Sequence, residues 1–346
     1  MHTPSRSDGA LATSADAAAP RKQLIVRIRN WVGDVVLGLP GLRLIESQGY
    51  SLHIVARGKW APALLAGYGW PVHVQPAKRA DKVKQLRALR EQCRQLDPGF
   101  DRRENALVMP ESFSSALEMR LAGLRGVGYG KEGRSLLLAR SERITLGGHA
   151  LISYWNLACR FLRVELPPPA HVGLLAEAGA VQEAERQLAA AGITGDFAMI
   201  CPFAAGLATS RKLAKKWPEF GRFAEQAQGA LGLPLVVYPG PGEHDQAREL
   251  YPAARMIEGA NLAVYIALLQ RAQIVISNDT GPAHMAAALG TRLISVLGPT
   301  IAREWAPWGP RVTVVQEPQP AEGTVWPTVD QVLDAARRSL ADGAAS

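Results

Sequence analysis

The stretch Ile274–Thr300, IVISNDTGPAHMAAALGTRLISVLGPT, identifies the fold class of this chain. Its apolar run Ile274–Ile276 predicts a buried strand, Pro282 opens an alanine-rich helix that Gly290 closes, and Leu293–Leu297 predicts a second strand. The turn before Pro282 carries a carboxylate, a hydroxyl and a glycine at a helix N-terminus. Unpaired N–H groups and the positive end of the helix dipole favour an anion there. The unit therefore predicts an α/β fold with a phosphorylated ligand at this turn.

The same alternation of apolar runs and helical periodicity extends along most of the chain. Strands are expected at Gln23–Ile28, Leu52–Ala56, Val72–Val74, Ala106–Met109, Phe197–Cys201 and Leu235–Tyr238. Helices are expected at Asp34–Ile45, Lys82–Leu96, Ala176–Ala191, Trp217–Leu231, Leu262–Arg271 and Val329–Ala341. Strands that alternate with helices indicate parallel βαβ units.

The proline run Leu166–Pro169 is the clearest linker, because consecutive prolines continue neither a helix nor a central strand. We expect two Rossmann-like, doubly wound domains, 22–168 and 169–328, facing a central cleft with the carboxyl ends of their strands. Residues 1–21 are expected to be a disordered tail, since they are rich in Ala, Ser and Asp and lack the apolar block of a secretory signal. Residues 329–346 are expected to form a C-terminal helix and tail, with the helix in a position to pack back across the domain junction.

Composition narrows the classes of partner. The net charge of +8 favours an acidic partner, which includes nucleic acid, an anionic membrane surface and a phosphorylated substrate. The basic segment 78–103 has few interleaved aromatic residues, which disfavours a nucleic-acid platform and leaves either an anionic membrane or plain solvent against it. No apolar run approaches the roughly 18 residues of a transmembrane helix. The three widely spaced cysteines fit a reducing cytoplasm and form no metal-like pair.

Asp34 follows the first expected strand in the loop that starts at Arg29. One interpretation is a helix cap, the commonest use of Asp at this position. The other is a carboxylate at the cleft edge that accepts a proton from a substrate hydroxyl. Gly33 beside it would let a ligand approach the backbone closely.

Three further features have both a functional and an ordinary interpretation. The loop Thr209–Lys216 holds four cations and two hydroxyls, which suit phosphate oxygens or simply a solvated surface. Glu243 ends a glycine-rich turn and either meets ribose hydroxyls or begins a helix with an acidic first turn. His284 either faces a phosphate or packs in the core. No Asp-x-Asp pair is present to hold a divalent cation on a diphosphate, so lysines and helix N–H groups would have to take its place.

Together these segments resemble glycosyltransferase family 9, the bacterial ADP-heptose:lipopolysaccharide heptosyltransferases. The resemblance extends from about Lys22 to Val315. Its most specific motif is Ser277–His284 followed by Leu297–Thr300. Three other segments occur in the same order as in the family: Val32–Asp34, Lys215–Pro218 and Gly242–Glu243. The segment Pro110–Leu117 is closer to the heptosyltransferase II branch, with Glu111 where the family usually has Asn.

The resemblance implies a GT-B fold and an inverting reaction that needs no metal and no cofactor. The donor would be ADP-L-glycero-D-manno-heptose, and the acceptor the inner core of lipopolysaccharide on lipid A-Kdo. The enzyme would be cytoplasmic and peripherally associated with the cytoplasmic face of the inner membrane, with no nucleic-acid partner.

The resemblance also assigns roles to individual residues. Asp34 would be the general base, Asp279 would contact the heptose hydroxyls, and Glu243 would hold the ribose. The remaining donor-binding residues would be Lys215, Thr280, Gly281, His284, Thr209 and Ser210, and the acceptor-side loop residues Gly33 and Ser112. Ala260 stands where some members place a Met near the adenine, which puts the base contact of the donor in question. Two alternatives stay open. They are a family member with another nucleotide sugar or acceptor, and a catalytically idle nucleotide- or glycan-binding homologue.

Overall fold

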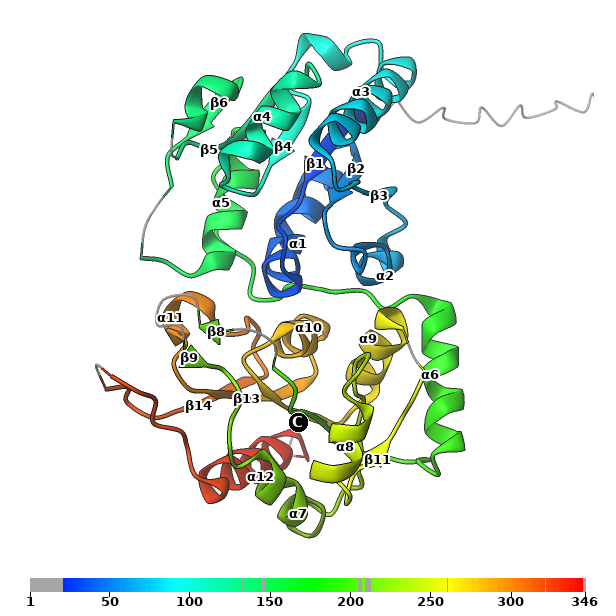
Figure 1. Ribbon diagram of the computed structural model, residues 1–346, viewed down its shortest axis with the longest axis vertical. Coiled ribbons are helices and arrows are strands. Elements are labelled where there is room, and N and C mark those ends of the chain that lie inside the picture. The colour runs from blue at the N-terminus through cyan, green and yellow to red at the C-terminus, as the bar shows by residue number, and fades with distance from the viewer. Residues whose placement is uncertain are drawn as a thin grey trace, which may run out of the picture.

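The computed structural model describes residues 21–131, 133–144, 147–204, 207–208, 213–259, 261–320 and 322–344. They form two parallel six-stranded sheets, each covered on both faces by helices (Figure 1). Thr209, Ser210 and Ala260, together with residues 1–20, lie outside the described residues, so the expectations placed on them are not tested by the structure.

The first sheet has the strand order β3-β2-β1-β4-β5-β6. Its strands are β1 (Lys22–Arg27), β2 (Tyr50–Ala56), β3 (Val72–Val74), β4 (Ala106–Val108), β5 (Gly126–Tyr129) and β6 (Arg140–Glu142). Its helices are α1 (Val32–Ser47), α2 (Ala61–Leu64), α3 (Arg79–Leu96), α4 (Phe113–Leu121) and α5 (Ala150–Leu162). This is the strand order of a dinucleotide-binding Rossmann domain, in which ligands bind where the order reverses beside β1.

The second sheet repeats that order as β11-β10-β7-β12-β13-β14. Its strands are β7 (Ala198–Cys201), β10 (Leu235–Val237), β11 (Arg255–Met256), β12 (Ile274–Asn278), β13 (Arg292–Leu297) and β14 (Val312–Gln316), beside an antiparallel pair, β8 (Leu207–Ala208) and β9 (Leu213–Ala214). Its helices are α6 (Ala178–Ala190), α7 (Phe220–Leu231), α8 (His244–Leu250), α9 (Leu262–Arg271), α10 (Gly281–Leu289), α11 (Ala302–Trp305) and α12 (Val329–Ala344). The expected pair of doubly wound Rossmann-like halves is confirmed.

The β12–α10–β13 unit forms as its sequence predicts. Five consecutive buried residues make β12, and α10 starts at Gly281 with Pro282 in its first turn. Gly290 ends α10 in the left-handed conformation, with φ of 78°, which costs glycine nothing because it has no Cβ. The short side chains of α10 allow it to be buried almost throughout, between its own sheet and the first half of the chain.

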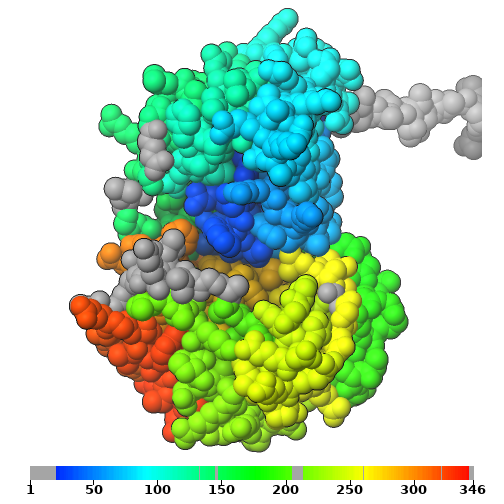
Figure 2. Space-filling model, viewed as in Figure 1, coloured from blue at the N-terminus to red at the C-terminus, as the bar shows by residue number. Residues whose placement is uncertain are grey.

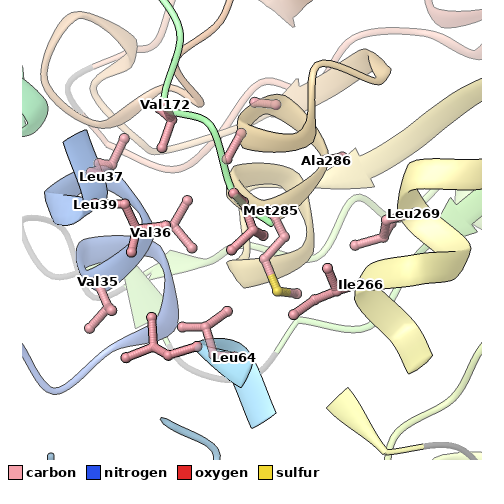
Figure 3. Close-up of a cluster of buried hydrophobic side chains, with 14 of the residues drawn as sticks. Val35, Val36, Leu37, Leu39, Leu64, Val172, Ile266, Leu269, Met285 and Ala286 are labelled. Atoms are coloured by element: carbon pink, nitrogen blue, oxygen red, sulfur yellow. The ribbon is translucent and has the colours of Figure 1, made fainter. Parts of the chain in front are cut away.

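The two halves share one apolar core where α1 packs against α10 and α2 against α9 (Figure 3). Val36 and Leu64 from the first half lie in the same buried cluster as Met285 and Ile266 from the second. The carboxyl ends of both sheets therefore lie at the junction between the two halves (Figure 2), where the blue segment that includes α1 faces the second half. Apolar contact thus continues across the junction and brings the loops that follow the strands of both sheets to the same region.

Two expectations about the connections have different outcomes. Between α5 and α6 the structure has neither helix nor strand, as the proline run predicts, although the domain limits at 168 and 169 stay a prediction. The expectation that the last helix packs back across the junction is wrong. Helix α12 packs against α7, β13 and β14 at the far end of the second half, because its apolar face joins the core on that side of the sheet.

Candidate functional site

Asp34 lies in the first turn of α1, immediately after β1, and its carboxylate does not cap the helix. Its Oδ1 accepts one hydrogen bond of 2.5 Å from the Tyr154 hydroxyl and another of 3.1 Å from Arg29 Nε. No hydrogen bond to Oδ2 occurs within the described part of the chain. The side chain is only 12% exposed. One oxygen is thus fixed by two donors while the other is left to receive a proton from a bound hydroxyl.

Tyr154 comes from α5, 120 residues after Asp34 in sequence, and its hydroxyl holds the Asp34 carboxylate in place. The Arg29 guanidinium lies over its ring, 5.5 Å from the centroid. Burial, followed by the charge of Asp34, raises the pKa of Tyr154 far above its ordinary value, so the phenol keeps its proton and acts as a donor. Burial by itself lowers the pKa of Arg29, but Tyr154, Asp34 and Glu111 together outweigh it, so the pKa is raised above its ordinary value. The Asp34 carboxylate is therefore held by one neutral and one cationic donor.

Glu111 connects this group to the loop after β4. Its carboxylate accepts hydrogen bonds from Arg29 Nη1 at 3.3 Å and from Lys131 Nζ at 3.1 Å. Ser112, the next residue, precedes α4, and its exposed hydroxyl is 3.1 Å from that of Ser115. The departure from Asn to Glu at position 111 thus has a physical consequence, since the carboxylate binds a second cation beside Arg29.

Asp279 is the buried acid of the opposite half, at the carboxyl end of β12. Its Oδ2 accepts hydrogen bonds from Lys215 Nζ at 2.7 Å and from Thr300 Oγ1 at 2.6 Å. Asn278 beside it fixes the approach of the lysine loop, because its Oδ1 accepts from the Trp217 backbone N–H at 3.0 Å. The structure therefore brings together Lys215 and Asp279, which are 64 residues apart in sequence.

Thr280 and Gly281 begin α10 next to this ion pair. The Thr280 side chain does not cap the helix, because its hydroxyl donates to the Asn278 carbonyl at 3.4 Å, so the first N–H groups of α10 are left without a side-chain acceptor. Gly281 is packed against α1, since an added Cβ would lie 3.2 Å from Val32 Cβ. The N-termini of α1 and α10 therefore almost touch, and a cation lies beside them.

His284 lies between the two acids. Its Nε2 is 3.8 Å from Asp279 Oδ1, and its ring covers Gly33 so closely that an added Cβ there would be 2.7 Å from Cδ2. Burial lowers the pKa of His284, against the opposing charges of Asp279 and Asp34. Burial therefore favours the neutral imidazole, which packs between Gly33 and Asp279, and the role of His284 in donor binding stays a prediction.

Glu243 precedes α8, and its Oε2 accepts from the Gly240 backbone N–H at 2.8 Å. The contact closes the glycine-rich turn, so in this structure the carboxylate supports its own loop. Nearby, the rings of Tyr238 and Tyr265 stack with centroids 5.0 Å apart. The buried Tyr238 hydroxyl has no hydrogen-bond partner among the described residues, and Tyr238 directly follows β10 in the loop that also carries Glu243.

The sequence did not identify two of the residues that complete the site. Tyr154 and Thr300 are the closest partners of the two buried acids, but both are common residue types, Tyr154 on a largely apolar helix and Thr300 in the loop after β13. The only early signal was that Thr300 closes the Leu297–Thr300 motif. In the part of the chain that the structure describes, three or more metal-ligating side chains of the His, Cys, Asp or Glu type do not gather anywhere. Within the same residues, every helix is too short or too polar to span a lipid bilayer.

Comparison with known proteins places this geometry in a family. The family model of glycosyltransferase family 9 (heptosyltransferase) matches residues 90–325. Lipopolysaccharide heptosyltransferase 3 of Escherichia coli is 31% identical over 133 residues, which are 36% of this chain and 37% of that protein. The alignment thus spans little more than a third of the relative's length.

Solved structures resemble almost the whole chain. ADP-heptose lipopolysaccharide heptosyltransferase II of E. coli superposes with a TM-score of 0.74 at 21% identity, covering 93% of this chain and 99% of the other. A family 9 glycosyltransferase of Veillonella parvula gives 0.76 at 17% identity, covering 93% and 97%. An E. coli heptosyltransferase solved with ADP-2-deoxy-2-fluoro heptose gives 0.64 at 20% identity, covering 93% and 99%. At these identities the likeness shows the GT-B fold alone.

Proposed function

This chain belongs to glycosyltransferase family 9, and from that premise we propose that it transfers heptose from ADP-L-glycero-D-manno-heptose to the inner core of lipopolysaccharide with inversion at the anomeric carbon. The observation that carries the proposal is the pairing of two supported acids across His284. Asp34 is held with one free oxygen on one side, and Asp279 with Lys215 on the other. The proposal places the acceptor against the first half and the donor against the second.

On the acceptor side, Asp34 removes the proton from the attacking hydroxyl. Its free Oδ2 accepts that proton while the oxygen forms a bond to the anomeric carbon, on the face opposite the diphosphate. Tyr154 and Arg29 fix Oδ1, so the carboxylate need not reorient as the bond forms. Gly33 and Ser112 border the same space, where the acceptor sugar would lie.

On the donor side, Lys215 and the N-terminus of α10 offset the charge that develops on the departing ADP. The ammonium is placed 2.7 Å from Asp279 before any ligand arrives, and α10, which starts at Gly281 two residues after Asp279, has no side-chain cap on its first N–H groups. These groups supply the positive charge that a divalent cation would otherwise supply, so we propose that the reaction is metal-independent. Asp279 would contact heptose hydroxyls and Glu243 the ribose, and Thr209 and Ser210 stay predicted donor-binding residues.

The proposal is tested by the isosteric variant Asp34→Asn with ADP-heptose and lipid A-Kdo as substrates. Transfer, followed by mass spectrometry of the acceptor, should fall by about 10²- to 10⁴-fold, the usual contribution of a general base. Asp245→Asn, which changes a fully exposed acid of the second half, is the matched control and should leave transfer unchanged. Normal turnover by Asp34→Asn would remove the base from the mechanism.

Two further measurements separate this proposal from its alternatives. Turnover with ADP-heptose is compared with turnover on UDP- and GDP-sugars, and a preference for either of the latter would reassign the donor. Chelation with EDTA should leave the rate unchanged, and an EDTA-sensitive rate restored by Mg²⁺ would contradict metal independence. Nucleotide binding with neither transfer nor donor hydrolysis would instead indicate a binding protein on this fold.

A further inference from the structure

A cavity of about 520 Å³ lies at the amino ends of the first sheet, opposite the carboxyl ends that carry Asp34. Lys22 is the first residue of β1, Tyr50 the first of β2, and Arg125 directly precedes β5. The six residues of β1 separate this cavity from the proposed transfer site by about 20 Å, at roughly 3.3 Å per residue. It is therefore a separate site, and the proposed function does not use it.

Positive charge dominates the lining of this cavity. The titratable residues that line it, apart from Tyr50, are Lys22, Arg102, Arg103, Arg125, Arg163 and a single acid, Glu104. Glu104 is already bound by Arg140, which is not part of the lining, through hydrogen bonds of 2.7 and 2.8 Å. Arg103 is paired with Asp97. The lining itself carries a net charge of about +4, because five cations face one carboxylate.

Three of these cations form no ion pair with any described carboxylate: Lys22, Arg102 and Arg125. Lys22 instead lies 5.6 Å from the centroid of the Tyr50 ring, and Tyr50 packs edge-on against Phe161 at 5.5 Å. An aromatic floor below several unpaired cations is suited to an anion attached to an apolar or ring-shaped body.

The backbone at the rim gives a second, independent observation. Arg163 ends α5 with φ of 60°, and it is the only described residue other than glycine with a positive φ. Glycine is the usual residue at this position of a helix end, because a side chain makes the left-handed conformation costly. The chain keeps an arginine despite that cost, and its guanidinium reaches into the rim of the cavity, 3.7 Å from Glu104.

We propose that this cavity binds a phosphate-bearing ligand through Lys22, Arg102 and Arg125. Doubly charged phosphate offsets the mutual repulsion of the cations, and arginine forks match phosphate oxygens in pairs. The phosphate has two possible sources, a soluble diphosphate and the headgroup of an anionic phospholipid. Either one would bind at the far end of the first half while the transfer site stays open.

The test titrates pyrophosphate into the full chain by calorimetry, in a Lys215→Ala background that removes the cation of the proposed donor site. The double variant Arg102→Ala/Arg125→Ala should bind pyrophosphate at least about tenfold more weakly, equivalent to about 1.4 kcal/mol. The matched control is Arg79→Ala/Arg120→Ala, which removes two exposed cations from other faces of the same half and should bind as the background does. A parallel arm sediments each protein with phosphatidylcholine vesicles, with or without phosphatidylglycerol.

The outcomes are distinct. Pyrophosphate binding that depends on Arg102 and Arg125 supports a soluble ligand, and retention on phosphatidylglycerol vesicles with the same dependence supports a lipid headgroup. If the pair variant and the control behave alike in both arms, the proposal is overturned. Should the pair variant fail to fold, the single variants Arg102→Ala and Arg125→Ala provide the same comparison. Sugar transfer is not the readout, so failure here leaves the proposed function untouched.

Discussion

Gly33→Ala tests whether His284 and α1 are packed as closely as the site requires. The added Cβ would lie 2.7 Å from Cδ2, 3.2 Å from Nε2 and 3.3 Å from Cγ of the buried imidazole. The first distance is about 1 Å shorter than an ordinary contact between carbon atoms. The ring cannot swing away freely, since it is packed between the two halves. The N-termini of α1 and α10 must therefore separate by up to that amount.

The stability change has two opposing parts. Overpacking in a filled core costs about 1–3 kcal/mol, while Ala in place of Gly within a helix stabilises by about 0.5–1 kcal/mol. The net result should be a loss of up to about 2 kcal/mol in the free energy of unfolding. Transfer should fall more steeply, by up to about 100-fold, because Asp34 is the next residue and a displacement near 1 Å disrupts a reacting geometry.

Gly38→Ala is the matched control, because it makes the same change in the same helix. Its added Cβ would meet the terminal methyl of Met109 at 2.6 Å, and the flexible thioether can move aside. Urea unfolding should show Gly38→Ala near wild type and Gly33→Ala destabilised. In the double variant Gly33→Ala/His284→Ala the penalty for Gly33→Ala should largely disappear. Equal stabilities for the two alanine variants, or a penalty that survives loss of the imidazole, would refute this account.

Three other predictions follow from single contacts. Tyr154→Phe should slow transfer about 10- to 100-fold without weakening donor binding, because a hydrogen bond to the charged Asp34 contributes about 1.5–3 kcal/mol; an unchanged kcat would exclude this support. Thr300→Val should lower the free energy of unfolding by about 1–3 kcal/mol, since it removes a buried hydrogen-bond donor to Asp279. The loss should exceed that of the control Thr291→Val, whose hydroxyl donates only to a neutral backbone carbonyl. Equal losses would contradict the view that the charge of Asp279 strengthens its hydrogen bond. Burial lowers the pKa values of His53, His73, His149 and His284 in the folded chain. Below about pH 6.5 the unfolded chain therefore binds more protons than the folded chain, so the free energy of unfolding should decrease as the pH is lowered. Thermal melts from pH 7.5 to 5 test this, and a melting temperature that does not change with pH would oppose it.

Much of the order of strands and helices was readable from sequence because it depends on local patterns, although β5, β6, β14, α4 and α5 were not expected. Apolar runs with helical segments between them gave both Rossmann-like halves, and β12–α10–β13 formed with its expected proline start and glycine end. The motifs also indicated which loops carry function, because parallel strands bring the loops after their carboxyl ends to one edge. The last helix was assigned correctly as an element but wrongly in its packing, because amphipathicity gives a buried face without naming the sheet that covers it.

The arrangement of the site was decided by tertiary structure. Nothing local distinguishes Tyr154 from other residues of an apolar helix, and only the packing of α5 against α1 brings its hydroxyl to Asp34. Whether Asp34 caps its helix or is free for chemistry was open in the sequence, and the structure rejects the cap. His284 packs against Gly33 because two helices from different halves share one core. Sequence patterns act over a few residues, whereas these contacts join positions more than a hundred residues apart, and only the folded chain determines them.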